Sequence, residues 1–309
     1  MQGNFCADIR RMTDQSKGLL LGFMAVVMFG LTLPITRFIS PYFEPVFIGL
    51  GRAVLACIAA VILLVVFKAP LPSYPQVKRL LVVALGVVIG FPLLTAWAMQ
   101  SLPASHGGVV LGILPLATAA ASRLVSDERP SLGFWLAGII GSLLVVAYSL
   151  LQGGGGFLLA DFALFAAVVS AALGYAVGGK LAKEMAGWQV ICWALVIVFP
   201  VIVIPALYYA PSELQTLNTS VIVGFLYLAL VSQLFGFFIW YKALAIGGIA
   251  RVSQIQLIQP FVTIAVSAWA LSEAIDLQTA IFAATVVAIV ALGKRMSIHS
   301  KHDSKHHSS

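Results

Sequence analysis

The sequence predicts an all-α integral membrane protein with ten transmembrane helices, arranged as two inverted five-helix repeats. Composition, the distribution of basic residues and an internal repeat carry this prediction. Of 309 residues, 61% are hydrophobic and only 9% are charged, whereas soluble domains average about 25% charged residues. A helix that crosses the bilayer needs about 20 apolar residues, so ten helices would use about 200 residues and leave short loops.

Splitting the chain at charges, Pro/Gly clusters and polar breaks gives ten candidate spans. In chain order they cover residues 18–38, 45–67, 79–100, 104–125, 131–151, 157–180, 188–209, 217–241, 249–270 and 276–293. The first span follows Arg10, Arg11 and Lys17 but has no small-residue cleavage site. We therefore expect it to remain as a helix and not to be a removable signal peptide.

Basic residues alternate strictly between the two sides of these spans. One side carries almost all of them: Arg10, Arg11, Lys17, Lys68, Lys78, Arg79, Arg123, Arg129, Lys180, Lys183, Lys242, Arg251, Lys294 and Arg295. The other side has only Arg37, at a helix end. Because cytoplasmic loops are enriched in Lys and Arg, both termini are predicted to be cytoplasmic.

The charge distribution and the cysteine spacing argue against a nucleic-acid partner, a disulfide framework and a metal site. The net charge of +7 comes from basic residues that are scattered between apolar runs, so it does not indicate a nucleic-acid partner. Cys6, Cys57 and Cys192 have no disulfide or metal-ligand spacing. The histidines of the polar tail could bind a metal loosely, but a disordered tail is the simpler interpretation. We expect no cofactor and no structural metal.

An internal repeat links the two halves of the chain. Pro115 is followed by Glu128 after thirteen residues, and Pro260 and Glu273 have the same spacing at an offset of 145. Because each half has an odd number of spans, the second half would enter the membrane from the opposite side, as in many secondary transporters. The expected organisation is an N-terminus (1–17), a first repeat (18–151), a Gly linker (152–156), a second repeat (157–293) and a disordered cytoplasmic tail (294–309).

These features resemble the EamA-type drug/metabolite transporters. The paired five-helix halves, the two Pro-then-Glu motifs and the basic residues Arg37 and Lys180 carry the resemblance, and within the superfamily the chain is most similar to YddG-type bacterial amino-acid exporters. The resemblance implies a multi-pass protein of the bacterial inner membrane that exports small metabolites, with the lipid bilayer and a small-molecule substrate as its partners. A monomer and a homodimer are both left open.

Polar and aromatic side chains within spans are candidates for the substrate path, because such residues are costly in the bilayer. The candidates are Met28, Thr32, Trp97, His106, Ser170, Tyr175, Gln233, Phe237, Trp240, Ser253, Gln254, Gln256 and Gln259. For the hydroxyl residues the alternative is a hydrogen bond to their own helix, and for Met28 it is packing. The amides would be costly if they faced lipid.

The repeat also suggests moving parts. Pro115 and Pro260 each remove a helix hydrogen bond near mid-span, which could make a hinge or only a packing kink. Arg37 with Glu273 at the outer face, and Lys180 with Glu128 at the inner face, could form ion pairs alternately as gates. Glu128 could instead favour the N-terminus of the following helix.

Energy coupling and substrate follow from the few ionisable groups within the spans. Acidic residues lie at span ends or in loops, so we expect facilitative transport by alternating access, or weak coupling through His106. Arg52 could snorkel to the outer surface, the default interpretation, or bind a substrate carboxylate. Amphipathic rings and amides suit neutral amino acids with broad specificity.

Other functions remain as alternatives. A multidrug or nucleoside transporter, or a lipid translocator, could use the same fold. An intramembrane enzyme is less favoured, since the spans offer no Ser/His pair, paired carboxylates or metal cluster. An ATP-driven pump is disfavoured because the chain has no P-loop motif.

Overall fold

A computed structural model describes residues 14–125, 129–130, 132–152, 159–212, 218–295 and 298–299. The first half comprises α2 (Asp14–Gly30), α3 (Thr32–Ile39), η1 (Phe47–Gly51), α4 (Arg52–Val66), α5 (Tyr74–Val83), η2 (Ala84–Gly90), α6 (Phe91–Ala98), α7 (Ala104–Leu111), α8 (Leu114–Val125), β1 (Arg129–Pro130) and α9 (Leu132–Gln152). The second half comprises α10 (Leu159–Leu181), α11 (Gly187–Tyr208), α12 (Thr219–Leu226), η4 (Tyr227–Phe235), α13 (Gly236–Gly247), α14 (Ile249–Val252), η5 (Ser253–Ile258), α15 (Gln259–Leu271), α16 (Leu277–Arg295) and β2 (Ile298–His299). The segments η1, η2 and η4 are π-helical and η5 is a 3₁₀ helix.

The helices form ten spans. Seven helical stretches of the described chain are long and apolar enough to cross a membrane, and the bent pair α7 and α8 makes an eighth. The fifth and tenth spans are α9 and α16, which are 21 and 19 residues long. The predicted ten-helix membrane fold is thereby confirmed.

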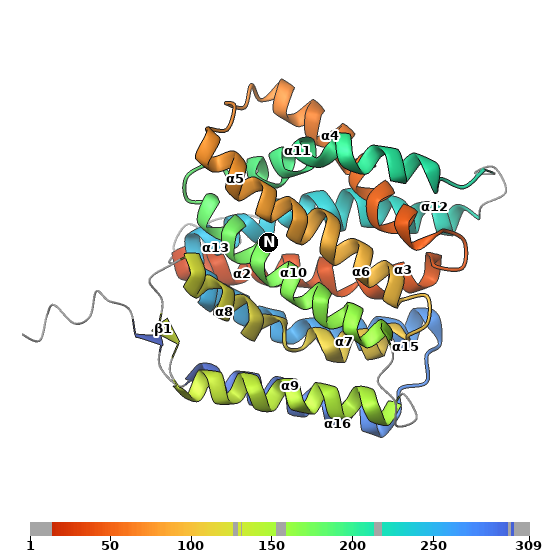
Figure 1. Ribbon diagram of the computed structural model, residues 1–309. Coiled ribbons are helices and arrows are strands. Elements are labelled where there is room, and N and C mark those ends of the chain that lie inside the picture. Colours follow the sequence, from red (N-terminus) through yellow and green to blue (C-terminus); the bar gives the residue numbers. More distant parts are fainter. Residues whose placement is uncertain are drawn as a thin grey trace, which may run out of the picture.

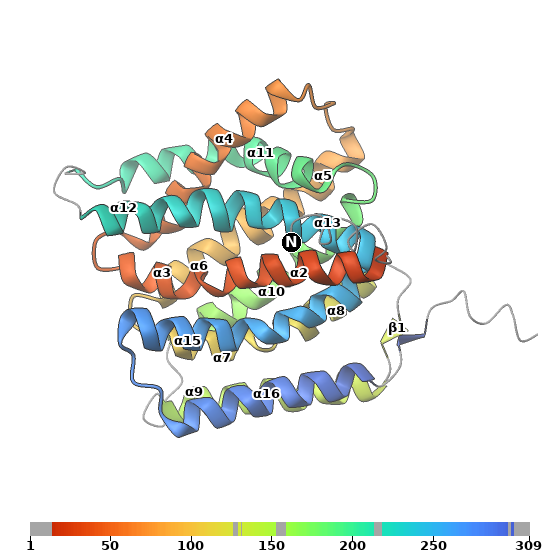
Figure 2. The same cartoon turned by 180° about the vertical axis from the view of Figure 1, so that it is seen from behind.

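Packing between the halves follows an approximate two-fold symmetry. The first span packs on the eighth through α2 and α13, and the sixth packs on the third through α10 and α6. Equivalent spans also pair with each other, as α4 does with α11, α7 with α15 and α9 with α16. Figures 1 and 2 show the α9–α16 pair along one edge of the bundle and the α4–α11 pair at the opposite edge.

The bundle carries apolar side chains on its outside and buries polar ones. Ile62 and Val65 on α4 and Ile204 on α11 are more than half exposed, as expected of lipid-facing residues. The interior holds eighteen buried polar or charged side chains among the described residues. Because polar groups inside a membrane protein usually face a cavity or the bundle interior, this distribution directs attention to the core.

Some boundaries differ from the predicted ones. The third span begins at Tyr74, before the predicted residue 79, because Gln76 Oε1 accepts a hydrogen bond from the Ser73 N–H and caps the helix before its charged residues. The eighth span continues to Gly247, so Lys242 lies on a helix. In the predicted disordered tail, Ile298–His299 pairs with Arg129–Pro130. The predicted Gly linker from residue 153 onward, Glu128 and residues 300–309 lie outside the described residues.

Candidate substrate site

Four aromatic rings meet in the interior between the two halves. This aromatic cluster consists of Phe29 on α2, Tyr175 on α10, and Phe237 and Trp240 on α13. The ring centroids of Phe29 and Phe237 are 5.1 Å apart, and those of Tyr175 and Trp240 are 5.4 Å apart. Trp240 is fully buried. The cluster therefore offers a closely packed, largely apolar surface that both halves build.

Three members of the aromatic cluster are residues that the sequence singled out: Tyr175, Phe237 and Trp240. The fourth member is Phe29, and not the predicted residue Met28 next to it. The main-chain carbonyl of Met28 accepts a hydrogen bond from the Tyr227 hydroxyl at 3.0 Å. Sequence reasoning missed Phe29 because a phenylalanine in an apolar span has no distinguishing pattern.

Two polar atoms beside the cluster have no protein partner. Gln233 lies one turn before Phe237 and is 1% exposed. Its Nε2 donates to the Val87 carbonyl at 3.1 Å, while its Oε1 is buried without a hydrogen bond. The indole Nε1 of Trp240 is likewise buried and unpaired. Since buried polar atoms are normally paired, these two atoms are candidate contacts for a ligand.

Arg52 is buried in the same interior. It begins α4 directly after the π-helical η1, and the residue is only 2% exposed. The expectation that it snorkels to the outer surface is therefore wrong.

Hydroxyl groups from the predicted path bond to the protein itself. Thr32 Oγ1 lies 2.9 Å from Ser232 Oγ, which joins α3 to η4. Ser170 Oγ donates to the Gly86 carbonyl on η2. Ser253 Oγ donates to the carbonyl of Ala250, three residues earlier. The Ser253 bond is the predicted alternative, a hydrogen bond within the residue's own span. The Thr32 and Ser170 bonds instead join different spans.

The ninth span contributes a second polar group. Gln256 is 1% exposed and neither atom of its amide has a partner, and Gln259 Oε1 is also buried and unpaired. Gln254 is only partly buried. These residues lie where η5 packs against α2 and α8. Two of the three predicted amides are therefore interior groups with unused hydrogen-bonding capacity.

Trp97 does not join these groups. It is 41% exposed on α6, so its ring projects toward the surface of the bundle. The prediction that it lines the path is not supported, because a tryptophan near a span end also suits an interfacial position.

His106 forms a buried pair with an acidic residue. Its Nε2 lies 2.7 Å from Asp161 Oδ1, and both side chains are at most 5% exposed. The imidazole ring also contacts the Tyr148 ring, with centroids 5.0 Å apart. Asp161 was placed at a span end by the sequence, but the fold turns it inward from the first turn of α10. The pair joins α7 to α10 near their N-terminal ends.

The predicted outer gate pair is not formed in this conformation. Glu273 accepts hydrogen bonds from the main-chain N–H groups of Ala104 and Ser105 at 2.9 and 3.0 Å. Arg37 Nη1 donates to the carbonyls of Met99 and Gln100. The carboxylate is thus placed at the N-terminus of α7, where unpaired N–H groups favour an anion. Glu273 and Arg37 therefore both form hydrogen bonds with the segment around the α6–α7 connection, but they do not form an ion pair with each other.

The face that was predicted to be the inner one has a different ion pair from the one predicted. Lys180 is exposed, and its proposed partner Glu128 lies outside the described residues. Instead, Arg79 on α5 forms a bidentate pair with Glu184, with distances of 2.5 and 2.6 Å. These hydrogen bonds lower the pKa of the Glu184 carboxyl. The sequence does not reveal this pair, because basic residues in loops also have the pattern of topology signals.

Both predicted hinge prolines sit just after breaks in their spans. Pro115 is the second residue of α8, which meets α7 at 41°, and Pro260 is the second residue of α15, which follows the 3₁₀ segment η5. Proline is well tolerated there because the first N–H groups of a helix have no intrahelical acceptor. The two breaks occupy equivalent places in the two halves.

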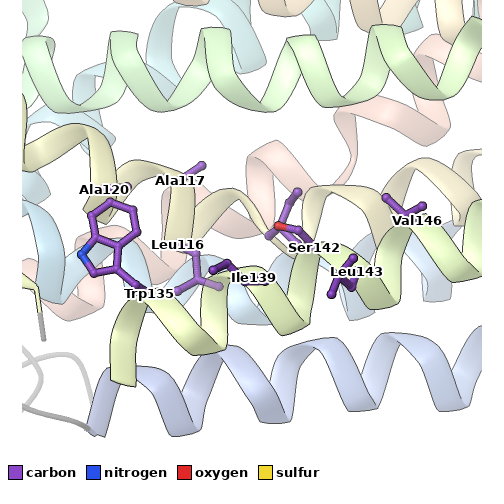
Figure 3. A pocket seen from close by; sticks show the side chains of 9 residues that line it. Leu116, Ala117, Ala120, Trp135, Ile139, Ser142, Leu143 and Val146 are labelled. Atoms are coloured by element: carbon purple, nitrogen blue, oxygen red, sulfur yellow. The ribbon is translucent and has the colours of Figure 1, made fainter. Parts of the chain in front are cut away.

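A polar pocket of about 500 Å³ opens beside the His106–Asp161 pair and includes Tyr148, Glu273 and Asp276. A second pocket, of about 400 Å³, lies between α8 and α9 and is almost wholly apolar. Figure 3 shows Trp135, Ile139 and Leu143 of α9 and Leu116 of α8 at this second pocket. Its apolar lining suits acyl chains better than a polar solute.

Comparisons with known proteins agree with this architecture. The EamA-like transporter family matches residues 16–150 and 158–293. The "Uncharacterized transporter YdeK" of Bacillus subtilis (strain 168) is 39% identical over 286 residues, which cover 93% of this chain and 100% of that protein. A crystal structure with 16% identity covers 92% of this chain and 100% of its own, with a TM-score of 0.66, and supports the fold alone. The chain belongs to the EamA-like transporter family.

Proposed function

We propose that this transporter exports small neutral metabolites, and that amino acids, aromatic and other neutral ones, are its substrates. The observation that carries the proposal is the aromatic cluster with its unpaired polar atoms, Gln233 Oε1 and Trp240 Nε1, at the interface between the halves. The charged groups of a zwitterionic amino acid could form hydrogen bonds with the unpaired polar atoms, and its apolar side chain could pack on the aromatic rings. Few directional contacts would allow broad specificity.

Alternating access between the inverted repeats is the mechanism that fits this position. The aromatic cluster takes α2 from the first repeat and α10 and α13 from the second, so rocking of one repeat against the other would expose it to each face in turn. The breaks before Pro115 and Pro260 would act as hinges. Within this proposal the protein lies in the bacterial inner membrane with both termini in the cytoplasm.

Transport is proposed to be facilitative. Among the described acidic residues, Asp161 is the buried one, and it lies at an outer span end in a pair with His106 and not beside the aromatic cluster. Membership of a transporter family is consistent with a protein that is not an enzyme.

Counterflow of labelled leucine and phenylalanine into proteoliposomes, with and without an imposed proton gradient, tests the proposal. We expect uptake that continues without the gradient and falls in Trp240→Phe, which removes the unpaired indole N–H. Trp269→Phe is the matched control, because Trp269 is 86% exposed. Strict dependence on the gradient would refute facilitative transport. Absence of amino-acid uptake would refute the substrate assignment and leave nucleosides, drugs and lipids to be tested.

A further inference from the structure

Arg52 is a buried cation without a protein counter-ion among the described residues. Its Nε is buried and has no hydrogen-bond partner. Several other charged side chains of the described chain have partners within the protein: Asp161 pairs with His106, Glu184 with Arg79, Asp14 with Lys17, and Glu273 caps α7. A buried guanidinium with no ion pair is strongly unfavourable, so its presence calls for an anion that the protein itself does not supply.

Local backbone structure directs this side chain inward. Arg52 follows η1 at once, and π-helical segments inside helices are frequent at functional sites. Within η1, a Cβ on Gly49 would lie 2.8 Å from the Leu93 Cα, so the absence of a side chain lets η1 approach the α6 backbone closely. This close contact fixes the rotation of the span, and with it the inward direction of Arg52.

Other buried groups of the interior complement the remaining parts of an amino acid. The α4 helix, which begins with Arg52, packs against η4, which carries Gln233 and its unpaired acceptor Oε1. Tyr175, a member of the aromatic cluster, is buried in the interior as Arg52 is. A carboxylate could bind the guanidinium, an ammonium could donate to the amide oxygen, and an apolar side chain could contact the rings.

We propose that Arg52 binds the carboxylate of the transported molecule, so that the substrates are carboxylates and not amines, amides or nucleosides. This inference rests on the proposed function for the transport step, but not for anion binding itself. A planar guanidinium can bind both oxygens of a carboxylate, which lysine cannot do with the same geometry.

The experiment compares leucine with leucinamide, which keeps the ammonium and side chain but lacks the carboxylate. Counterflow into proteoliposomes is measured for the native protein, Arg52→Gln and Arg52→Lys. The native protein is expected to prefer leucine by about 10- to 100-fold, the usual contribution of a charge-assisted contact. Arg52→Gln should abolish this preference by raising the KM for leucine, and Arg52→Lys should keep part of it. Arg251→Gln, at an exposed arginine on α14, is the control.

Thermal stability separates binding from folding. Removal of an unpaired buried charge should leave the apparent unfolding temperature in detergent unchanged or raise it, whereas loss of a structural contact would lower it. Leucine and simple monocarboxylates such as isovalerate should stabilise the native protein and Arg52→Lys, but not Arg52→Gln. A preference for leucine that survives in Arg52→Gln would overturn the inference.

The two proposals can fail separately. If the native protein transports no amino acid, the proposed function fails, and monocarboxylate stabilisation that depends on Arg52 would still support the anion site. If leucine is transported but leucinamide is transported equally well, the transport proposal stands and the Arg52 inference is wrong. The absence of both transport and carboxylate stabilisation overturns both.

Discussion

His106 and Asp161 form a buried pair, and its contribution to the stability of the protein can be tested directly. Replacement of His106 by Leu removes the imidazole hydrogen bond to the buried carboxylate, which should cost about 1.5–3 kcal/mol. Asp161→Asn keeps a neutral acceptor and should cost about 1–3 kcal/mol. The measurement is unfolding in detergent, and a double variant should lose less than the sum of the two. Additive losses would show that the two side chains are not coupled.

The Arg79–Glu184 pair makes a pH-dependent contribution to stability. Because Arg79 lowers the pKa of Glu184, the pair stabilises the folded protein above the unfolded pKa of a glutamate. This contribution is lost as the pH falls through the lowered pKa of the folded state. The two side chains are about one-third exposed, so Glu184→Gln should cost only about 0.2–1 kcal/mol at pH 7.

Unfolding temperatures of the native protein and Glu184→Gln should therefore differ at neutral pH and converge at strongly acidic pH. The exposed Glu44→Gln is the control. A difference that is constant across the pH range would contradict the assignment.

At the scale of elements, the contact between η2 and α10 depends on a glycine. A Cβ on Gly86 would lie 2.6 Å from the Ser170 carbonyl oxygen and 3.0 Å from the Gly174 Cα, and neither main-chain atom can rotate away. Gly86→Ala should separate the two segments and destabilise the protein by about 1–3 kcal/mol. Leu85→Ala, at a neighbouring residue that is 59% exposed, should have little effect. Equal effects of the two substitutions in thermal unfolding would argue against this close contact.

The break before α15 should matter for rate more than for stability. Pro260→Ala restores an N–H group and allows η5 and α15 to continue as a straighter helix. We expect a reduction in maximal counterflow rate of about fivefold, equivalent to about 1 kcal/mol, with little change in KM. Pro200→Ala, inside the unbroken α11, serves as the comparison. An unchanged rate in Pro260→Ala would indicate a packing kink and not a hinge.

At the scale of the whole molecule, the inverted topology predicts which loops face which side. Tyr42 lies in the connection after the first span, and Lys183 follows the sixth. A cysteine at residue 42 should react with a membrane-impermeant thiol reagent on intact cells, and one at residue 183 only after permeabilisation. Both cysteines are introduced with Cys6 replaced by Ser, and Cys57 and Cys192 are buried, so background labelling should be low. The reverse pattern would invert the proposed orientation.

The sequence by itself determined the membrane class, the number of spans and the repeat, because these depend on local hydropathy and on spacing along the chain. It also singled out Tyr175, Phe237, Trp240 and Gln233, which the structure places in the interior, since polar and amphipathic residues stand out in apolar spans. The positions of the two broken spans followed from Pro115 and Pro260, although the sequence did not show that each proline begins a new helix.

Only the tertiary structure decided which side chains meet. Whether Arg52 faces lipid or the core depends on the rotation of its span, which the Gly49–Leu93 contact fixes and local hydropathy does not encode. The partners of His106, Arg37 and Glu273 come from helices or connections distant in the chain, and several acceptors were available to each charge. Composition records that a charge is present in a span; packing determines whether it contacts lipid, a protein partner or a substrate.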